Sequence, residues 1–167
     1  MLPRRPLTVL VLATALLAGC GGDDSPQTKE GFISAADGVC EDLFSEFAQL
    51  SSGQPTTPQD VADANNQLAD TYEKLAARLD KVPLPEKGAA RTQAQAFVRS
   101  VDAARPQLVK LRAASMRFVD AAEAENRAAI TKAGSDVRAA LDGFRSARAS
   151  SDRLAIELGL NFCGNLG

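Results

Sequence analysis

Apolar residues recur at alternating intervals of three and four along most of the chain, which is the spacing of one face of an α-helix. Four segments carry this pattern, at residues 32–50, 58–82, 90–119 and 130–158. Each segment therefore predicts an amphipathic helix with one buried face. The main apolar positions are Ala36, Cys40, Leu43, Phe47 and Leu50 in the first segment, Val61, Leu68, Tyr72, Leu75, Leu79 and Val82 in the second, Ala94, Phe97, Val101, Ala104, Leu108, Leu111 and Phe118 in the third, and Ile130, Ala133, Val137, Ala140, Phe144, Leu154 and Leu158 in the fourth. Further apolar residues widen the first and third stripes, namely Val39, Phe44, Val98, Val109, Met116 and Val119.

Residues that start or end helices separate the four segments. Thr57-Pro58-Gln59-Asp60 combines a cap, a proline at the first helical position and an acid three residues after the cap, which together favour a helix start. Pro83-Leu84-Pro85 ends the second segment. The polar residues around Ala124-Glu125-Asn126 predict a tight turn, and Gly159 is the natural end of the last helix.

Two residues interrupt the pattern. Asn65 stands at an apolar position of the second segment. It lies near the end of the bundle, or Ala64 faces inward in its place, or Asn65 is a buried polar group that fixes the packing register. Pro106 lies inside the third segment, where it removes one backbone hydrogen bond and clashes with the preceding turn. We expect a kink near residues 102–106 or, as the alternative, two separate helices.

These segments predict an all-α protein that folds as an up-down antiparallel four-helix bundle, because short connections place successive helices side by side in opposite directions. The first and fourth helices are neighbours in such a bundle. After Gly159, Leu160 and Phe162 are expected to fold back onto the core and bring Cys163 to Cys40 on the first helix.

The amino-terminal region predicts export and lipid attachment. Arg4 and Arg5 precede twelve uncharged, mostly apolar residues at 7–18, a run that is too short to span a membrane comfortably and is typical of a secretion signal. The following Leu17-Ala18-Gly19-Cys20 resembles the lipobox of bacterial lipoproteins, in which the cysteine receives a diacylglyceryl group and becomes the first residue of the mature chain. The alternative is an ordinary signal peptide followed by an accidental cysteine.

This resemblance implies three parts of the chain: a lipoprotein signal peptide at 1–19, an acylated flexible tether at 20–30 and a single four-helix domain at 31–167. Acyl chains such as palmitate on Cys20 would hold the protein on the extracytoplasmic face of the cell membrane without a spanning helix.

The other two cysteines, Cys40 and Cys163, are expected to pair, because an exported chain matures in an oxidising place. In the chain-entropy model, closing a loop of about 120 residues contributes about 4 to 5 kcal/mol. The alternatives are a free redox thiol or a metal ligand, but the chain has no CxxC motif and no histidine.

Composition and charge exclude several functional classes. Without histidine, the usual Ser-His-Asp and Cys-His sites, histidine metal sites and Glu-x-x-His di-iron bundles are excluded. The formal net charge is −2, which does not indicate binding to nucleic acid. Loss of residues 1–19 removes two arginines and no acid and leaves a net charge of −4, so the lipid rather than basic residues would hold the protein on the membrane.

No group of residues predicts a reaction. The acidic groupings do not have the spacing of a calcium loop, and the fourth helix has an ordinary charged face on which acids interleave with arginines. Tyr72 could ligate haem, but at a core position it is more typical of packing. We expect no enzyme, no catalytic residue, no metal site and no cofactor. The acidic groupings contain Asp23, Asp24, Asp120, Glu123 and Glu125, and the charged face of the fourth helix contains Arg138, Arg145, Arg148, Arg153, Asp136, Asp142 and Asp152.

Two cysteine segments add to the lipobox. The chain has Ala-Ala-Asp-Gly-Val-Cys-Glu at 35–41 and Glu-Leu-Gly-Leu-Asn-Phe-Cys-Gly at 157–164. With Ala-rich and Arg-rich helices between them, it resembles small actinobacterial lipoproteins with a two-cysteine helical domain. The resemblance implies a disulfide between Cys40 and Cys163, a location and a fold, but no activity.

We therefore expect a non-enzymatic helical domain that contacts an envelope protein, a cell-wall component or a sensor domain. The alternative is a carrier of a small apolar ligand, a lipid or haem, within the bundle. An enclosed apolar cavity of several hundred Å³ would favour the carrier. We also expect a monomer.

Overall fold

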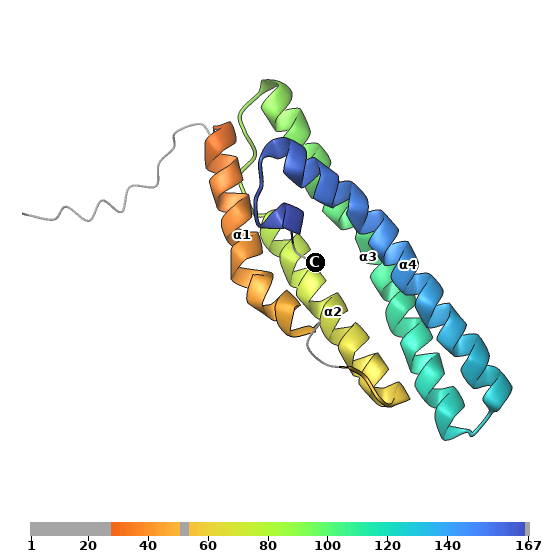
Figure 1. Cartoon of the computed structure of the whole chain (residues 1–167). Coiled ribbons are helices and arrows are strands. Elements are labelled where there is room, and N and C mark those ends of the chain that lie inside the picture. Colours follow the sequence, from red (N-terminus) through yellow and green to blue (C-terminus); the bar gives the residue numbers. More distant parts are fainter. Residues whose placement is uncertain (1–27, 51–53, 166–167) are drawn as a thin grey trace, which may run out of the picture.

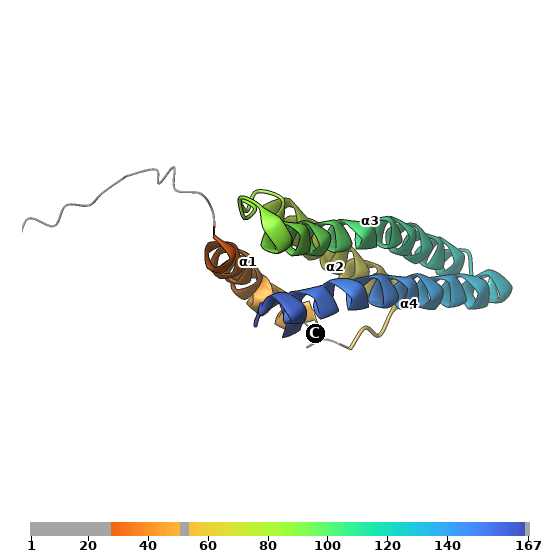
Figure 2. The same cartoon turned by 90° about the horizontal axis from the view of Figure 1, so that it is seen from above.

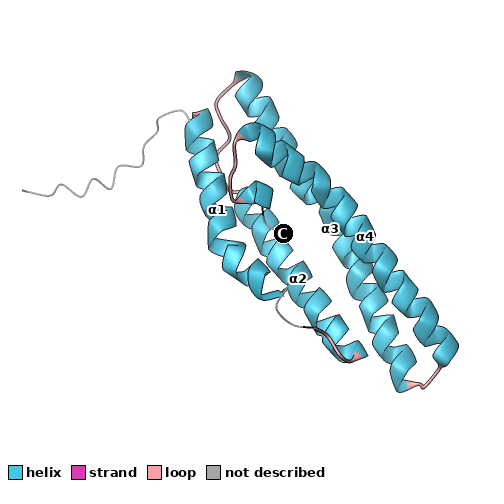
Figure 3. Cartoon of the chain, in the orientation of Figure 1, coloured by secondary structure: helices cyan, strands magenta, loops and turns pink. Residues whose placement is uncertain are grey.

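The computed structural model describes residues 28–50 and 54–165, without the side chain of Leu50. These residues form four α-helices and a short 3₁₀ helix, and none of them lies in a strand (Figure 3). The helices are α1 (Lys29–Leu50), α2 (Pro58–Leu79), α3 (Gly88–Glu123) and α4 (Arg127–Leu158), followed by η1 (Cys163–Asn165). The prediction of an all-α, four-helix protein is confirmed. The predicted signal peptide and Cys20 lie outside the described residues.

α1 begins earlier than the pattern predicted. The Thr28 hydroxyl accepts a hydrogen bond from the Gly31 N–H at 3.0 Å, as an N-cap does. Lys29 and Glu30 are therefore helical, and the prediction of a flexible tether up to residue 30 is wrong at these two positions. Thr28 alone is a weaker cap signal than the Thr57 motif, so the sequence pattern did not predict this helix start.

α2 starts as its motif predicted. The Thr57 side chain accepts from the Asp60 N–H while the Asp60 carboxylate accepts from the Thr57 N–H, which completes a capping box. The hydrogen bonds that the Asp60 carboxylate makes with Thr57 and Thr56 lower the pKa of Asp60. The helix ends at Leu79, three residues before the predicted end, yet Val82 beyond it is still buried.

α3 runs without a break through Pro106, so the alternative of two separate helices is wrong. The predicted turn follows at residues 124–126, where Glu125 has a φ of 49° and the Asn126 side chain caps α4. Gly159 ends α4 with a φ of 91°, a left-handed conformation that glycine adopts without steric cost.

Consecutive helices are antiparallel, as their contacts require (Figure 1). The end of α2 lies beside the middle of α1, where Arg78 pairs with Asp42. The start of α2 lies beside the far half of α3, and the Phe118 ring of α3 lies close to Gly134 near the start of α4. With 36 and 32 residues, α3 and α4 form a pair about 50 Å long.

α1 does not pack along α4, contrary to the prediction that the first and fourth helices are neighbours. The carboxyl-terminal segment contacts both helices and lies between them (Figures 1 and 2). Its Leu160 and Cys163 side chains are buried, so they fill the space where α1 and α4 would otherwise meet. Phe162 was also predicted to return to the core, but it is 37% exposed.

Candidate functional site

The disulfide joins α1 to the segment after α4. The sulfur atoms of Cys40 and Cys163 lie 1.99 Å apart, at disulfide-bonding distance, and both residues are buried. The predicted pairing of these two residues is therefore seen in the structure, and neither is placed as a free thiol. The disulfide therefore joins α1 to η1, which contains Cys163, and not to α4 itself.

Asp37 adds a second attachment at the same place. Its carboxylate accepts the backbone N–H groups of Asn161, Phe162 and Cys163 at 2.9, 2.7 and 3.1 Å. Hydrogen bonds to a charged acceptor are stronger than those between neutral groups. Asp37 lies one helical turn before Cys40, so both residues face the returning segment. No local sequence pattern indicated Asp37; its place three residues before a buried cysteine was the one available signal.

A small cavity lies in the core beside the disulfide. Its volume is about 10 Å³, which is close to the minimum for one water molecule. A site for a small organic ligand usually measures about 300 Å³ or more. The walls come from all four helices and η1, and they are Cys40, Phe47, Tyr72, Leu75, Leu79, Phe97, Val101, Arg148, Ser151, Asp152 and Cys163.

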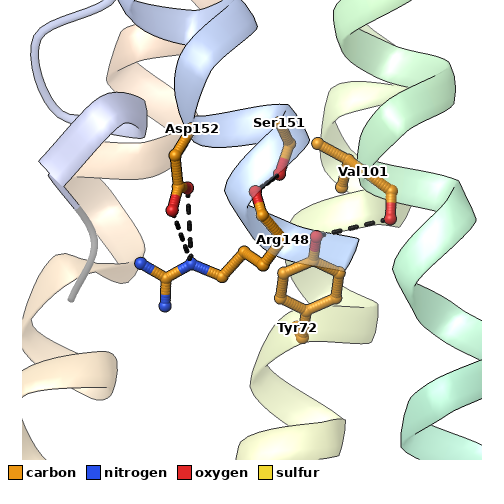
Figure 4. A network of polar contacts seen from close by, with 5 residues as sticks. All are labelled: Tyr72, Val101, Arg148, Ser151 and Asp152. Atoms are coloured by element: carbon orange, nitrogen blue, oxygen red, sulfur yellow. Dashed lines mark hydrogen bonds and ion pairs between the residues drawn. The ribbon is translucent and has the colours of Figure 1, made fainter. Parts of the chain in front are cut away.

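Tyr72 forms part of this wall, and its hydroxyl has a hydrogen-bond partner within the protein (Figure 4). Its hydroxyl donates to the Val101 carbonyl at 3.3 Å. Its ring meets the Phe144 ring edge-on, with centroids 5.0 Å apart. Burial raises the pKa of Tyr72 to about 12. The phenol is therefore a neutral core group at ordinary pH, which agrees with the interpretation of Tyr72 as packing.

The Arg148–Asp152 ion pair on α4 (Figure 4) contributes to the polar side of the cavity. Arg148 Nε donates to both carboxylate oxygens of Asp152 at 3.3 Å. The two side chains are 19% and 29% exposed, less than those of any other ion pair of the described residues. The Ser151 hydroxyl donates to the Arg148 carbonyl at 2.7 Å. Arg148, Ser151 and Asp152 therefore supply the polar part of the cavity wall.

The rest of the charged face of α4 is solvated, as predicted. Arg145 pairs with Asp142 at 3.2 Å, and Arg153 lies 4.0 Å from Glu157. Lys132 donates to Asp136 at 2.8 Å, and this hydrogen bond lowers the pKa of Asp136. Exposed pairs of this kind contribute little to stability.

Asn65 is a buried polar residue with a partner on another helix. It is 7% exposed, and its side-chain amide donates to the hydroxyl of the fully buried Ser115 at 2.9 Å. Asn65 itself therefore lies in the core, so the suggestion that Ala64 faces inward in its place is wrong. Ala64 is half-buried. The third alternative, a buried polar group, describes the structure.

Within residues 28–50 and 54–165, no group of three or more acidic or cysteine side chains is placed to hold a metal ion. Asp120, Glu123 and Glu125 at the α3–α4 turn are all exposed, whereas Asp23 and Asp24 fall outside these ranges. No helix in the same ranges is long and apolar enough to cross a membrane.

The chain was compared with protein families, curated proteins and solved structures. No family model matches the chain, and no curated protein or solved structure matches it.

Proposed function

We propose that this protein is a membrane-anchored lipoprotein of the cell envelope whose helical domain binds another envelope component and catalyses no reaction. The observation that carries the binding role is the filled core. Its cavity measures about 10 Å³, far below the size of a usual ligand site, so recognition takes place on the outer surface. The partner is an envelope protein, a cell-wall component or a sensor domain.

The anchor rests on the lipobox at residues 17–20. Seven residues lie between Cys20 and Thr28, where the described domain begins, so eight residue steps join the two positions. Fully extended, they span at most about 29 Å. Acylation of Cys20 therefore keeps the start of the domain within about 29 Å of its attachment point, on the extracytoplasmic face.

The anchor is tested by fractionation of a bacterial host that processes lipoproteins. The full chain is expected in the membrane fraction, with an intact mass that corresponds to an acylated amino-terminal Cys20. Cys20→Ser is expected in the soluble fraction and without acyl chains. Cys163→Ser is the matched control, because it also removes one cysteine but leaves the lipobox. Membrane retention of Cys20→Ser without acylation contradicts the anchor.

A carrier of a lipid or haem is the second candidate, and the observation in its favour is the apolar cavity wall around Phe47 and Tyr72. Entry of such a ligand requires α1 or the Arg148–Asp152 pair to move. Native mass spectrometry of the exported chain separates the two roles. A co-purifying small molecule that is lost on denaturation supports the carrier, whereas a bare chain that cross-links to an envelope component in cells supports the binding domain.

A further inference from the structure

The outer face of α3 carries apolar side chains that nothing in the described chain covers. Val109 is 64% exposed and Met116 is 50% exposed, although both were predicted to widen the buried stripe. Pro106 and Ala113 are exposed as well. These four residues are spaced by three, four and three, so they form one continuous stripe along the helix. Asp102, Arg105 and Lys110 line a shallow hollow together with Pro106 and Val109.

Charged residues flank this stripe in the same order at both ends. Arg99 and Asp102 precede it, and Arg117 and Asp120 follow it. All four side chains are exposed. Within the chain, Asp102 lies 3.5 Å from Arg105, and Arg117 lies 4.0 Å from Asp136. Both are long contacts, which leave the charges available to a further partner.

The repeated order makes the stripe complementary to itself. A second, antiparallel α3 can be centred between Val109 and Lys110. Arg99 of each copy then faces Asp120 of the other, and Asp102 faces Arg117. The same register places Ala103 opposite Met116 and Pro106 opposite Ala113.

Charge distinguishes this register from a neighbouring one. A shift by three residues places Asp102 opposite Asp120 and Arg105 opposite Arg117, so like charges repel each other. Charge complementarity of this kind selects partner and register more than it raises affinity.

We propose that the outer face of α3, from Arg99 to Asp120, is a two-fold symmetric interface with a second copy of this chain. Such an interface uses the same patch on both copies. This proposal goes beyond binding to an envelope component and departs from the expectation of a monomer. Attachment of both copies to one membrane raises their effective concentration and favours pairing of a modest surface.

Cysteine cross-linking of the full chain in its membrane tests the register. In the proposed dimer the two Val109 residues are offset by one residue, about 1.5 Å along the helix axis, whereas the two Ala113 residues are offset by about 10 Å. Val109→Cys is expected to give a covalent dimer that reduction abolishes. Ala113→Cys is the matched control and is expected to remain uncross-linked. The unsubstituted chain controls for Cys20, Cys40 and Cys163.

Charge reversal tests whether Asp102 of one copy pairs with Arg117 of the other. Asp102→Arg in the Val109→Cys chain is expected to lower the dimer yield several-fold, because it places two positive charges opposite each other. Asp102→Arg combined with Arg117→Asp is expected to restore the dimer yield, because opposite charges then face each other again at both of these positions. Asp142→Arg on α4, which also breaks an exposed pair three residues apart, is expected to leave the yield unchanged.

Three results overturn the proposal. The first is absence of the Val109→Cys dimer, and the second is an equal yield from Ala113→Cys. The third is cross-linking of Val109→Cys to a different protein in place of a second copy, which assigns the stripe to that protein. Circular dichroism of each variant shows that it is folded, so a missing dimer cannot be attributed to unfolding.

Discussion

The backbone N–H of Cys163 donates to Asp37 Oδ1 at 3.1 Å, one helical turn before the residue to which the Cys163 sulfur is bonded. α1 therefore holds the carboxyl-terminal segment by a covalent bond and by a carboxylate that accepts three N–H groups. Both contacts fall within one turn of α1, so this helix holds the returning segment at two neighbouring points.

Asp37→Ala is expected to lower the free energy of unfolding by about 1 to 3 kcal/mol, because three backbone donors lose a charged acceptor. Urea denaturation of the oxidised protein measures this change. Asp42→Ala is the matched control on the same helix, and loss of its exposed pair with Arg78 is expected to cost less than about 1 kcal/mol. Equal effects of the two substitutions contradict a special role for Asp37.

Removal of the disulfide is expected to loosen α1 before the rest of the domain. Cys40→Ala with Cys163→Ala should lower the free energy of unfolding by about 2 to 5 kcal/mol. α1 does not pack along α4, so its remaining contacts are mainly with α2 and the carboxyl-terminal segment. Amide hydrogen exchange should therefore increase more in α1 than in α3 and α4. A uniform increase in all four helices contradicts this prediction.

The Asn65–Ser115 hydrogen bond is expected to couple α2 to α3. Asn65→Ala leaves the Ser115 hydroxyl without this partner in a buried place, and Ser115→Ala does the same to the Asn65 amide. The double substitution should therefore cost about 0.5 to 1.5 kcal/mol less than the sum of the single ones. A double-mutant cycle from urea denaturation measures the coupling. Additive values would show that the two residues act independently.

Tyr72 is expected to ionise late in the folded protein. Its folded-state pKa of about 12 exceeds the ordinary value of 10.0, so the unfolded chain loses this proton first as pH rises. Between these values the folded state binds more protons, and stability falls with increasing pH by up to about 3 kcal/mol. Below pH 10 the stabilisation from protonated Tyr72 is fully present. In Tyr72→Phe, the fall in the free energy of unfolding between pH 10 and pH 12 that comes from Tyr72 should be absent.

Tyrosinate absorbance measures this ionisation directly, because Tyr72 is the single tyrosine and the chain has no tryptophan. The urea-unfolded chain is the reference and should titrate near the ordinary value. A folded protein that titrates at the same pH as the unfolded chain contradicts the burial argument.

Local signals predicted the four helices and several of their ends. The Thr57–Asp60 capping box, the turn at residues 124–126 and Gly159 each depend on neighbours within a few residues, and each was placed correctly. Asp37 was missed, because its partners lie more than 120 residues away. The partner of Asn65 lies 50 residues away, so sequence spacing left its environment open.

By itself, the sequence determined four amphipathic helices, their main buried faces and the one pair of cysteines that could join the first helix to the carboxyl end. These features follow from helical periodicity and from a short list of cysteines. The tertiary structure alone decided that the carboxyl-terminal segment lies between α1 and α4, that Asn65 meets Ser115, and that Val109 and Met116 face outward. A helix pattern shows which residues share a side, but which neighbours cover that side depends on how all the helices pack together.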